Sequence, residues 1–354
     1  MLNILRELTR LHGPSGHEQS VSYYIKEKVE SLCDTVKMDN LGNVTAVKNG
    51  GKPGPAVILT AHMDEVGFIV KKVEANGLLR FEKLGGHDDR ILLGQKVEVQ
   101  TKEGTLLGVI GTISAHYAKF DDPKKVRNYR HLYVDIGASS KEQAEALGVE
   151  IGDTITWTSE MRFLGNENTG KLIGKAFDDR AGCTVLLKLM EELNQQEAFP
   201  GKMIFIFTVQ EEVGLRGATV AASDVQADVA IAVDTTAVSD TPEETMDNSL
   251  YLGAGTGIKM MDFSLIAHPT VRARLVELAK EYNIDFQSEV FPGIGTDGGA
   301  VSLANKGIST GVLSIPSRYA HSPTEVIDME DLKATKELIK AFILSLDSET
   351  EFPF

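Results

Sequence analysis

The sequence predicts an α/β fold in which a mostly parallel β-sheet is sandwiched by helices and carries an inserted, small β-barrel-like domain. Buried strands alternate with amphipathic helices before residue 68 and after about residue 171, which is typical of a parallel sheet covered on both faces. Between these parts lie short alternating segments separated by Gly, Asn and Asp turns. We therefore expect one α/β domain, formed by residues 1–67 and 166–354, and a β-rich insertion at residues 68–165.

The first elements follow from helical periodicity and one buried strand. The N-terminal stretch MLNILRELTRLHG and residues 17–33 carry apolar side chains at helical intervals, so we expect two amphipathic helices. The first mixes Arg and Glu with its apolar residues and therefore differs from a signal peptide. The run PAVILTAHMDEVGF then contains a buried strand at residues 57–61, which ends in a polar turn.

The insertion has a different texture. The segments GLLRFEKLGG, GQKVEVQTKEGTLLGVIGTIS, HLYVDIGAS and EIGDTITWT are short and alternate between apolar and polar residues. This pattern is the signature of a small β-barrel or sandwich.

The remainder of the chain returns to alternating helices and strands. We expect a helix over 177–196, strands over 203–209 and 228–236, a helix over 269–283, a strand near 311–315 and a helix over 330–346.

The composition excludes several classes of protein. The chain has 354 residues, and its formal net charge of −15 argues against nucleic-acid binding, because phosphates require a basic face. No apolar run approaches the roughly 18–20 residues that cross a bilayer. Only Cys33 and Cys183 occur, so there is no disulfide framework and no CxxC metal knuckle. We therefore expect a cytoplasmic protein without nucleic-acid or membrane partners.

A histidine or a carboxylate follows each predicted buried strand of the α/β part. In addition, the helix that begins near residue 177 opens with two aspartates. Because ligands of open α/β sheets bind beyond the carboxyl ends of the strands, we expect these side chains to share one rim of the sheet. They are His62, Asp64, Asp178, Asp179, Glu211, Glu212, Asp234 and His321.

This set of side chains suits a pair of divalent ions, for which zinc, cobalt and manganese are the natural candidates. In such a site the ions lie about 3.5–4 Å apart, one carboxylate bridges them, and each ion takes a histidine and a terminal carboxylate. One further carboxylate stays unbound and removes a proton from the bridging water. The adjacent Glu211 and Glu212 fit this division, because one can bind metal while its neighbour handles protons.

Each of these features also has a simpler structural explanation. A histidine at a strand end can be a partly buried residue with a satisfied hydrogen bond, Asp178-Asp179 can cap a helix, and Glu211-Glu212 can be a solvated turn. These explanations are independent of one another, yet all the features fall at one end of one predicted sheet. The coincidence favours the metal site.

Five motifs, in order and at matching spacing, resemble a known family. They are AHMDEVGF, KAFDDRAGC, QEEVGLRGA, VDTT and SRYAHSPTE. The chain resembles the tetrahedral aminopeptidases, a cytosolic family of dinuclear metallopeptidases, over essentially its whole length, and looks closest to the bacterial glutamyl aminopeptidases. The resemblance implies an enzyme that removes N-terminal residues from short peptides.

The resemblance also implies a role for each residue of the rim. Two divalent metal ions, zinc or cobalt, would be the cofactors. Glu211 would be the general base, and Asp64 would orient a ligand imidazole from behind. Asp178 would bridge the ions, whereas Asp179 would cap the helix. The metal ligands would be His62, Asp178, Glu212, Asp234 and His321.

By the same resemblance, the insertion mediates dimerisation, and dimers assemble into a hollow tetrahedral homododecamer. Active sites that face the inside of such a particle would limit substrates to short or unfolded peptides. His87 and His116 fall within the insertion, where a structural or intersubunit role is expected in preference to a ligand role.

A preference for Glu or Asp at the first residue of the substrate would require a cation in the pocket, because an unpaired buried carboxylate is costly. Lys259 is the first candidate for this cation, and Arg318 is the second. Asp297 lies on a Gly-rich loop that could line the substrate pocket, although the loop can equally be a turn that needs positive φ.

Four alternatives stay open. The same dinuclear site could have broad or Leu-type specificity, or it could serve a carboxypeptidase or an N-acyl-amino-acid deacylase. A third alternative is a peptide-binding shell without catalysis, which would have no use for an unbound Glu211. A metal-independent glycoside hydrolase fits worst, since adjacent glutamates diverge along a strand and the histidines would have no role.

Overall fold

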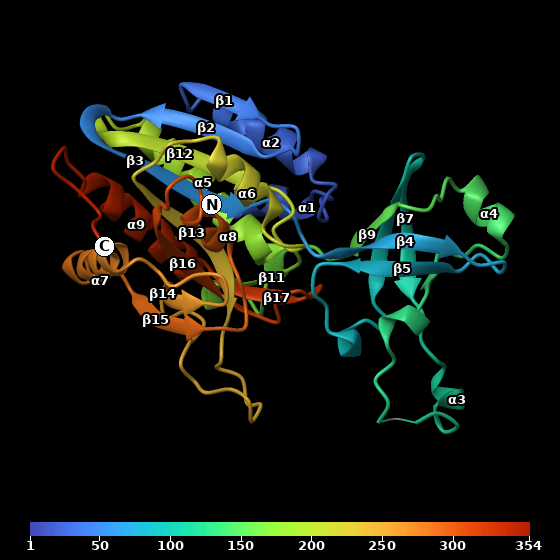
Figure 1. Ribbon diagram of the computed structural model, residues 1–354. Helices are drawn as coiled ribbons and strands as arrows, with labels where there is room; N and C mark the ends of the chain where they lie inside the picture. The colour runs from blue at the N-terminus through green and yellow to red at the C-terminus, as the bar shows by residue number, and fades with distance from the viewer. Residues whose placement is uncertain (123) are drawn as a thin grey trace.

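The computed structural model describes residues 1–122 and 124–354. It consists of a layered α/β body and a β-barrel that projects from one side of this body (Figure 1). None of the described helices is long and apolar enough to cross a membrane.

The body is built on an eleven-stranded sheet. Its strands, in spatial order, are β1 (Thr35–Met38), β2 (Val44–Asn49), β12 (Phe199–Thr208), β3 (Gly51–His62), β13 (Val229–Ala237), β16 (Ser309–Arg318), β17 (Glu325–Asp328), β11 (Lys171–Gly174) and β10 (Arg162–Phe163), with β14 (Thr256–Asp262) pairing to β16 and β15 (Phe286–Phe291) pairing to β14.

The centre of this sheet is parallel, and most of the strands at its margins are antiparallel. Strands β12, β3, β13 and β16 run parallel, as the alternation of strands and helices predicts. Most of the strands added on both sides are antiparallel to their neighbours, whereas β15 runs parallel to β14, so the complete sheet is mixed. In the parallel centre, His62 pairs with Thr208 and Thr60 pairs with Ala232. The carboxyl ends of three neighbouring strands therefore lie at one level.

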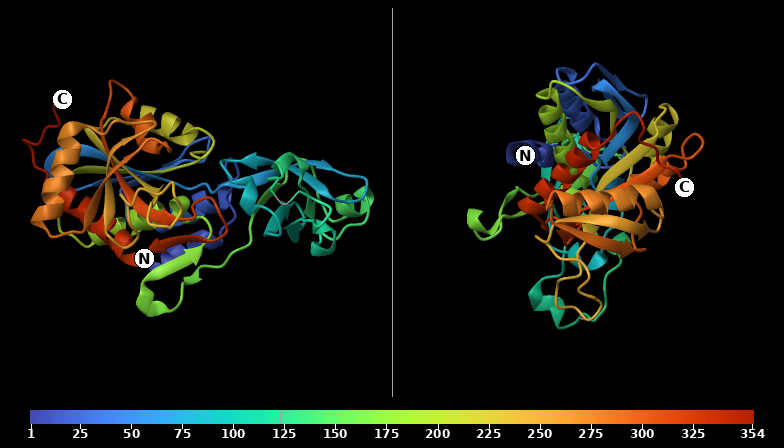
Figure 2. Two further views of the ribbon diagram at one scale, coloured as in Figure 1. Left: turned by 90° about the horizontal axis from the view of Figure 1, so that it is seen from below. Right: turned by 90° about the vertical axis from the view of Figure 1, so that its left-hand side faces the viewer.

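Helices cover both faces of the sheet (Figures 1 and 2). Strand β3 shows why, because Val57 and Leu59 belong to one hydrophobic cluster whereas Ile58 belongs to another. The first cluster is shared with α1 (Leu2–Arg10), α2 (Gln19–Glu30), α5 (Phe177–Asn194), α7 (Pro269–Glu281) and α9 (Met329–Leu344). The second is shared with α6 (Arg216–Ser223) and α8 (Asp297–Ser302).

The barrel closes in the order β4-β5-β8-β7-β6-β9. Its core contains Phe68, and the rings of Phe81 and Trp157 each pack edge to face with the ring of Phe68. Its elements are β4 (Gly67–Val73), β5 (Leu79–Leu84), the short helix η1 (Asp89–Ile91), β6 (Lys96–Thr101), β7 (Gly104–Ile110), α3 (Ala115–Ala118), η2 (Tyr129–His131), β8 (Val134–Asp135), α4 (Lys141–Ala146) and β9 (Thr154–Trp157), and η3 (Glu167–Thr169) follows β10 in the body.

Candidate metal centre

The rim residues converge because the strands that carry them are neighbours. His62 ends β3, and Asp234 lies near the end of β13. Glu211 and Glu212 follow β12, and His321 lies in the loop after β16. The start of α5 contributes Asp178 to the same edge, where the backbone departs from helical geometry and the Asp178-Asp179 bond is cis.

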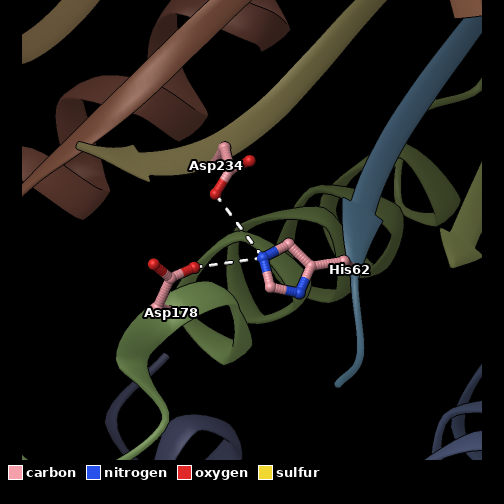
Figure 3. Close-up of side chains that lie close together, drawn as sticks. All are labelled: His62, Asp178 and Asp234. Atoms are coloured by element: carbon pink, nitrogen blue, oxygen red, sulfur yellow. Dashed lines mark hydrogen bonds and ion pairs between the residues drawn. The ribbon is translucent and has the colours of Figure 1, made fainter. Parts of the chain in front are cut away.

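A first group of ligands forms around His62 (Figure 3). Its Nε2 atom lies 3.0 Å from Oδ1 of Asp178 and 3.6 Å from Oδ1 of Asp234. These three residues offer ligand atoms that all lie within 4.8 Å of one another, which is close enough to hold one ion.

A second group forms around His321. Its Nε2 atom lies 3.2 Å from Oε1 of Glu212 and 3.5 Å from Oδ2 of Asp178. Asp178 thus belongs to both groups, with Oδ1 facing one histidine and Oδ2 facing the other. Oε1 of Glu212 is buried and has no hydrogen-bond partner among the described residues. This arrangement of imidazole and carboxylate donors fits two divalent cations that share one carboxylate.

The buried carboxylates at this edge of the sheet would be stabilised by nearby positive charge. Burial raises the pKa of Glu211 well above its usual range and the pKa of Asp234 to about 6. Burial opposes protonation of His62, but hydrogen bonds to Asp178, Asp234 and Asp64 outweigh it and raise the pKa of the imidazole. Carboxylates packed this closely are costly unless cations neutralise them.

Asp64 holds the pair of glutamates in place. Its Oδ1 atom accepts a hydrogen bond from the backbone N–H of Glu211 at 2.9 Å, and Oδ2 accepts from Glu212 at 3.2 Å. The hydroxyl of Ser15 donates to Oδ2 at 2.6 Å. Oδ1 also lies 3.4 Å from Nδ1 of His62, the nitrogen that faces away from the ligand group.

Glu325 was not among the predicted site residues, although it closes the motif SRYAHSPTE. Its buried carboxylate accepts backbone hydrogen bonds from Asp178 at 3.1 Å and from His321 at 2.9 Å, so it joins the two ligand groups from behind. A carboxylate four residues after His321 was the available signal for Glu325.

Asp179 accepts a hydrogen bond from the backbone of Gly182, as a helix-capping side chain does.

The ligand groups open into a cavity of about 550 Å³. Glu211 lines this cavity together with both histidines and with Asp178, Glu212 and Asp234. The remaining wall is largely apolar or made of small residues. It is formed by Gly214, Leu215, Thr235, Thr236, Ala237, Phe263, Ser264, Gly293, Ile294, Gly295 and Ala320.

Lys259, Arg318 and Asp297 are not among the described residues that line this cavity. Lys259 is fully buried, with Nζ 3.4 Å from Oε1 of Glu289. Arg318 forms two hydrogen bonds of 2.8 Å with Asp240. Asp297 is buried and accepts a hydrogen bond from the hydroxyl of Thr208, and burial raises its pKa to about 7.

Several curated proteins are similar to this chain over nearly their full length. A putative aminopeptidase of Acetivibrio thermocellus is 39% identical over 96% of this chain and 98% of its own. A lysyl aminopeptidase of Pyrococcus furiosus is 33% identical over 97% and 96%. A glutamyl aminopeptidase of Lactococcus lactis is 31% identical over 98% and 96%.

Solved structures and a family model agree with these relatives. An aminopeptidase of the archaeon Desulfurococcus kamchatkensis matches with a TM-score of 0.92 at 39% identity, over 98% of this chain and 95% of its own. The TET1 peptidase of Pyrococcus horikoshii, described as assembling into a tetrahedron or a large octahedral shell, matches with a TM-score of 0.86 at 33% identity, over 98% and 99%. The family model described as M42 glutamyl aminopeptidase covers residues 42–338. The chain therefore belongs to the M42 glutamyl aminopeptidase family, and its fold is that of the tetrahedral aminopeptidases.

Proposed function

We propose that this protein is a dinuclear metallo-aminopeptidase that removes N-terminal residues from short peptides. The observation that carries the proposal is the position of Asp178, whose two carboxylate oxygens face two different histidines. In this proposal His62 and Asp234 complete one metal site, and Glu212 and His321 complete the other. Asp178 belongs to both sites.

Two divalent cations at these ligands, zinc or cobalt in our proposal, would polarise the scissile carbonyl and make the attacking water more acidic. Glu211 would accept the proton of this water and pass it to the leaving amine. Its carboxylate lines the cavity and belongs to neither of the two groups that could hold an ion, so it is free to take up the transferred proton. Asp64 keeps Glu211 in place through the backbone hydrogen bond of 2.9 Å.

The cavity supports a broad or apolar specificity better than the Glu/Asp preference expected from Lys259. An acidic preference has the support of the glutamyl aminopeptidase of Lactococcus lactis. However, Lys259 is fully buried beside Glu289, and the described lining contains no lysine or arginine. Leu215, Phe263 and Ile294 instead offer an apolar surface to the first side chain of a peptide.

A panel of chromogenic amides (Leu, Glu, Asp, Lys and N-acetyl-Glu), assayed before and after chelation and again after addition of zinc or cobalt, tests the proposal. We expect cleavage that requires metal, is fastest for the Leu amide and is undetectable for the acetylated amide. Faster cleavage of Glu and Asp amides would restore the acidic preference. Cleavage of the acetylated substrate would indicate a deacylase, and activity that survives chelation would overturn the dinuclear mechanism.

We further propose that the insertion at residues 68–165 mediates dimerisation and that dimers form a tetrahedral dodecamer in the cytoplasm. The TET1 peptidase of Pyrococcus horikoshii supports this assembly. Exposed apolar side chains on the barrel also support it, since Leu107, Tyr117 and Phe120 expose 64%, 65% and 77% of their surface. The location in the cytoplasm agrees with Cys33 and Cys183, both of which are free thiols.

A further inference from the structure

A loop of the barrel lies against the second ligand group. This loop, residues 85–88, follows β5 and begins with two glycines. The carbonyl of Gly86 lies 2.8 Å from Nδ1 of His321, the ring nitrogen that faces away from Glu212. A Cβ atom on Gly85 would lie 2.7 Å from Val66 and 3.3 Å from Cβ of Glu212, so only glycine lets the backbone approach this closely.

The neighbouring His87 anchors this loop to the barrel. Its Nε2 atom lies 2.8 Å from the carbonyl of Gly67, and its ring stacks on Phe68 with 4.4 Å between the ring centres. The same ring lies nearly perpendicular to the ring of Trp157, with 5.5 Å between the ring centres. Lys83 closes the loop from the other side by donating to the carbonyl of His87 at 2.8 Å.

His321 needs such an external partner more than His62 does. The side chain of His321 is 34% exposed, compared with 2% for His62, and its backbone has φ of 61° in a loop. A carbonyl acceptor at Nδ1 fixes the proton on this nitrogen and directs Nε2 towards Glu212 and Asp178. Glu325 holds only the backbone of His321, so Gly86 provides the contact that orients the ring.

We infer that His87 is a positioning residue for His321, acting through the carbonyl of Gly86. It would hold the second ligand group, formed by Asp178, Glu212 and His321, in a geometry ready for metal, while leaving the group around His62 unaffected. The barrel would thus contribute to one of the two sites and not to the other. This inference rests on the proposed dinuclear function.

Stepwise cobalt binding to the chelator-treated protein, measured by calorimetry, tests the inference. We expect the wild type to bind two cobalt ions, and His87→Ala to bind one of them about 10-fold or more weakly, as is usual when a partner behind a ligand is lost. The other affinity should change by less than about 3-fold. His87→Gln, whose amide can still donate to Gly67, should recover most of the loss.

Two further variants keep the test decisive. His87→Phe retains a ring against Phe68 and removes the ring nitrogens, including the one that bonds Gly67, so it should weaken the same single site even if His87→Ala does not fold. His131→Ala, an exposed change on η2, serves as the control. Fluorescence of Trp157, the single tryptophan of the chain and a neighbour of His87, reports whether the barrel core is intact.

The outcomes separate this inference from the proposed function. Unchanged cobalt affinities in His87→Phe, or an equal loss at both sites, would overturn the positioning role. A wild-type protein that binds fewer than two ions would instead overturn the dinuclear function itself.

Discussion

The carboxylates at the site fall into two kinds, according to the groups that their oxygens contact. Asp178, Asp234 and Glu212 turn oxygens towards the Nε2 atom of a histidine, whereas Asp64 and Glu325 accept hydrogen bonds from the backbone of residues at the site. A buried carboxylate without a partner is costly, and so are buried backbone N–H groups that lose their acceptor. Replacing Asp64 or Glu325 should therefore be tolerated as poorly as replacing a carboxylate that faces a histidine.

Glu211→Gln is the most direct test of the proton transfer. The amide is similar in shape but cannot take the proton of the attacking water, so we expect kcat to fall by about 10²–10⁴-fold. Two metal ions should still bind, as measured by elemental analysis after dialysis. The control is Glu197→Gln, an exposed change in the loop before β12, which should leave kcat unchanged. A variant Glu211→Gln with more than a tenth of normal kcat would exclude the proposed base.

The sequence indicated the rim residues because most of them follow a strand with a clear apolar run and Asp178 opens a helix, and the structure brings His62, Asp178, Glu212, Asp234 and His321 together. Their roles as ligands stay predictions. Glu325 could have been predicted only from its place four residues after His321, and Gly86 could not have been predicted, because both act on or through backbone groups and leave no pattern of side-chain types. The same limit applies to Lys259, since motif position alone does not say which side of a strand faces a cavity.

At the scale of elements, the parallel strands and the helices between them were the predictable part. Helices predicted over 177–196 and 330–346 correspond to α5 and α9, and the strand predicted over 203–209 corresponds to β12. The antiparallel strands at the margins were missed. Strands β10, β11 and β17 are only two to four residues long and are defined by pairing with distant segments, which local periodicity does not record.

Helix α6 must pack very closely behind the turn that carries Glu211. A Cβ atom on Gly217 would lie 2.2 Å from the carbonyl oxygen of Val209, which also accepts the backbone hydrogen bond of Gly217 at 3.0 Å. Gly217→Ala should therefore lower the free energy of unfolding by about 1–3 kcal/mol, measured in urea. Thr219→Ala on the exposed side of α6 should change it by less than about 0.5 kcal/mol. Equal effects of both changes would contradict this account of the packing.

At the scale of the whole molecule, body and barrel meet at His12. Its ring nitrogens lie 3.1 Å from the hydroxyl of Thr156 and 2.6 Å from that of Thr154, both in β9. Burial lowers the pKa of His12 to about 4. The folded protein therefore binds fewer protons than the unfolded chain between pH 6.5 and 4, and stability falls as the pH decreases through this range.

The contribution of His12 can be isolated with His12→Gln, which does not titrate. From pH 7 to pH 5, we expect the wild type to lose at most about 2 kcal/mol more unfolding free energy than this variant does. Urea unfolding at both values gives the difference. His131→Gln, an exposed change on η2 of the barrel, should follow the wild type. An identical pH response of His12→Gln and wild type would show that His12 does not titrate on unfolding.

Assembly can be tested through the exposed apolar side chains of the barrel. If the barrel forms the dimer contact, Phe120→Ser should reduce the fraction of large particles in sedimentation velocity, because a side chain that is 77% exposed in the subunit would lose its contact with the partner. Leu303→Ser removes a similarly exposed side chain from the α/β body and should keep the dimer. A wild type that sediments as a monomer would refute the assembly proposal.

The register of the sheet has a consequence for how such a cavity can change. His62 and Asp234 lie on neighbouring strands, which are about 4.8 Å apart. The backbone hydrogen bonds between these strands therefore fix the distance between the two side chains. Phe263 and Ile294 come from loops beside β14 and β15, outside the parallel strands. The residues that contact the substrate side chain can therefore change without altering the spacing of His62 and Asp234. Relatives named for glutamyl and lysyl substrates can thus share one fold.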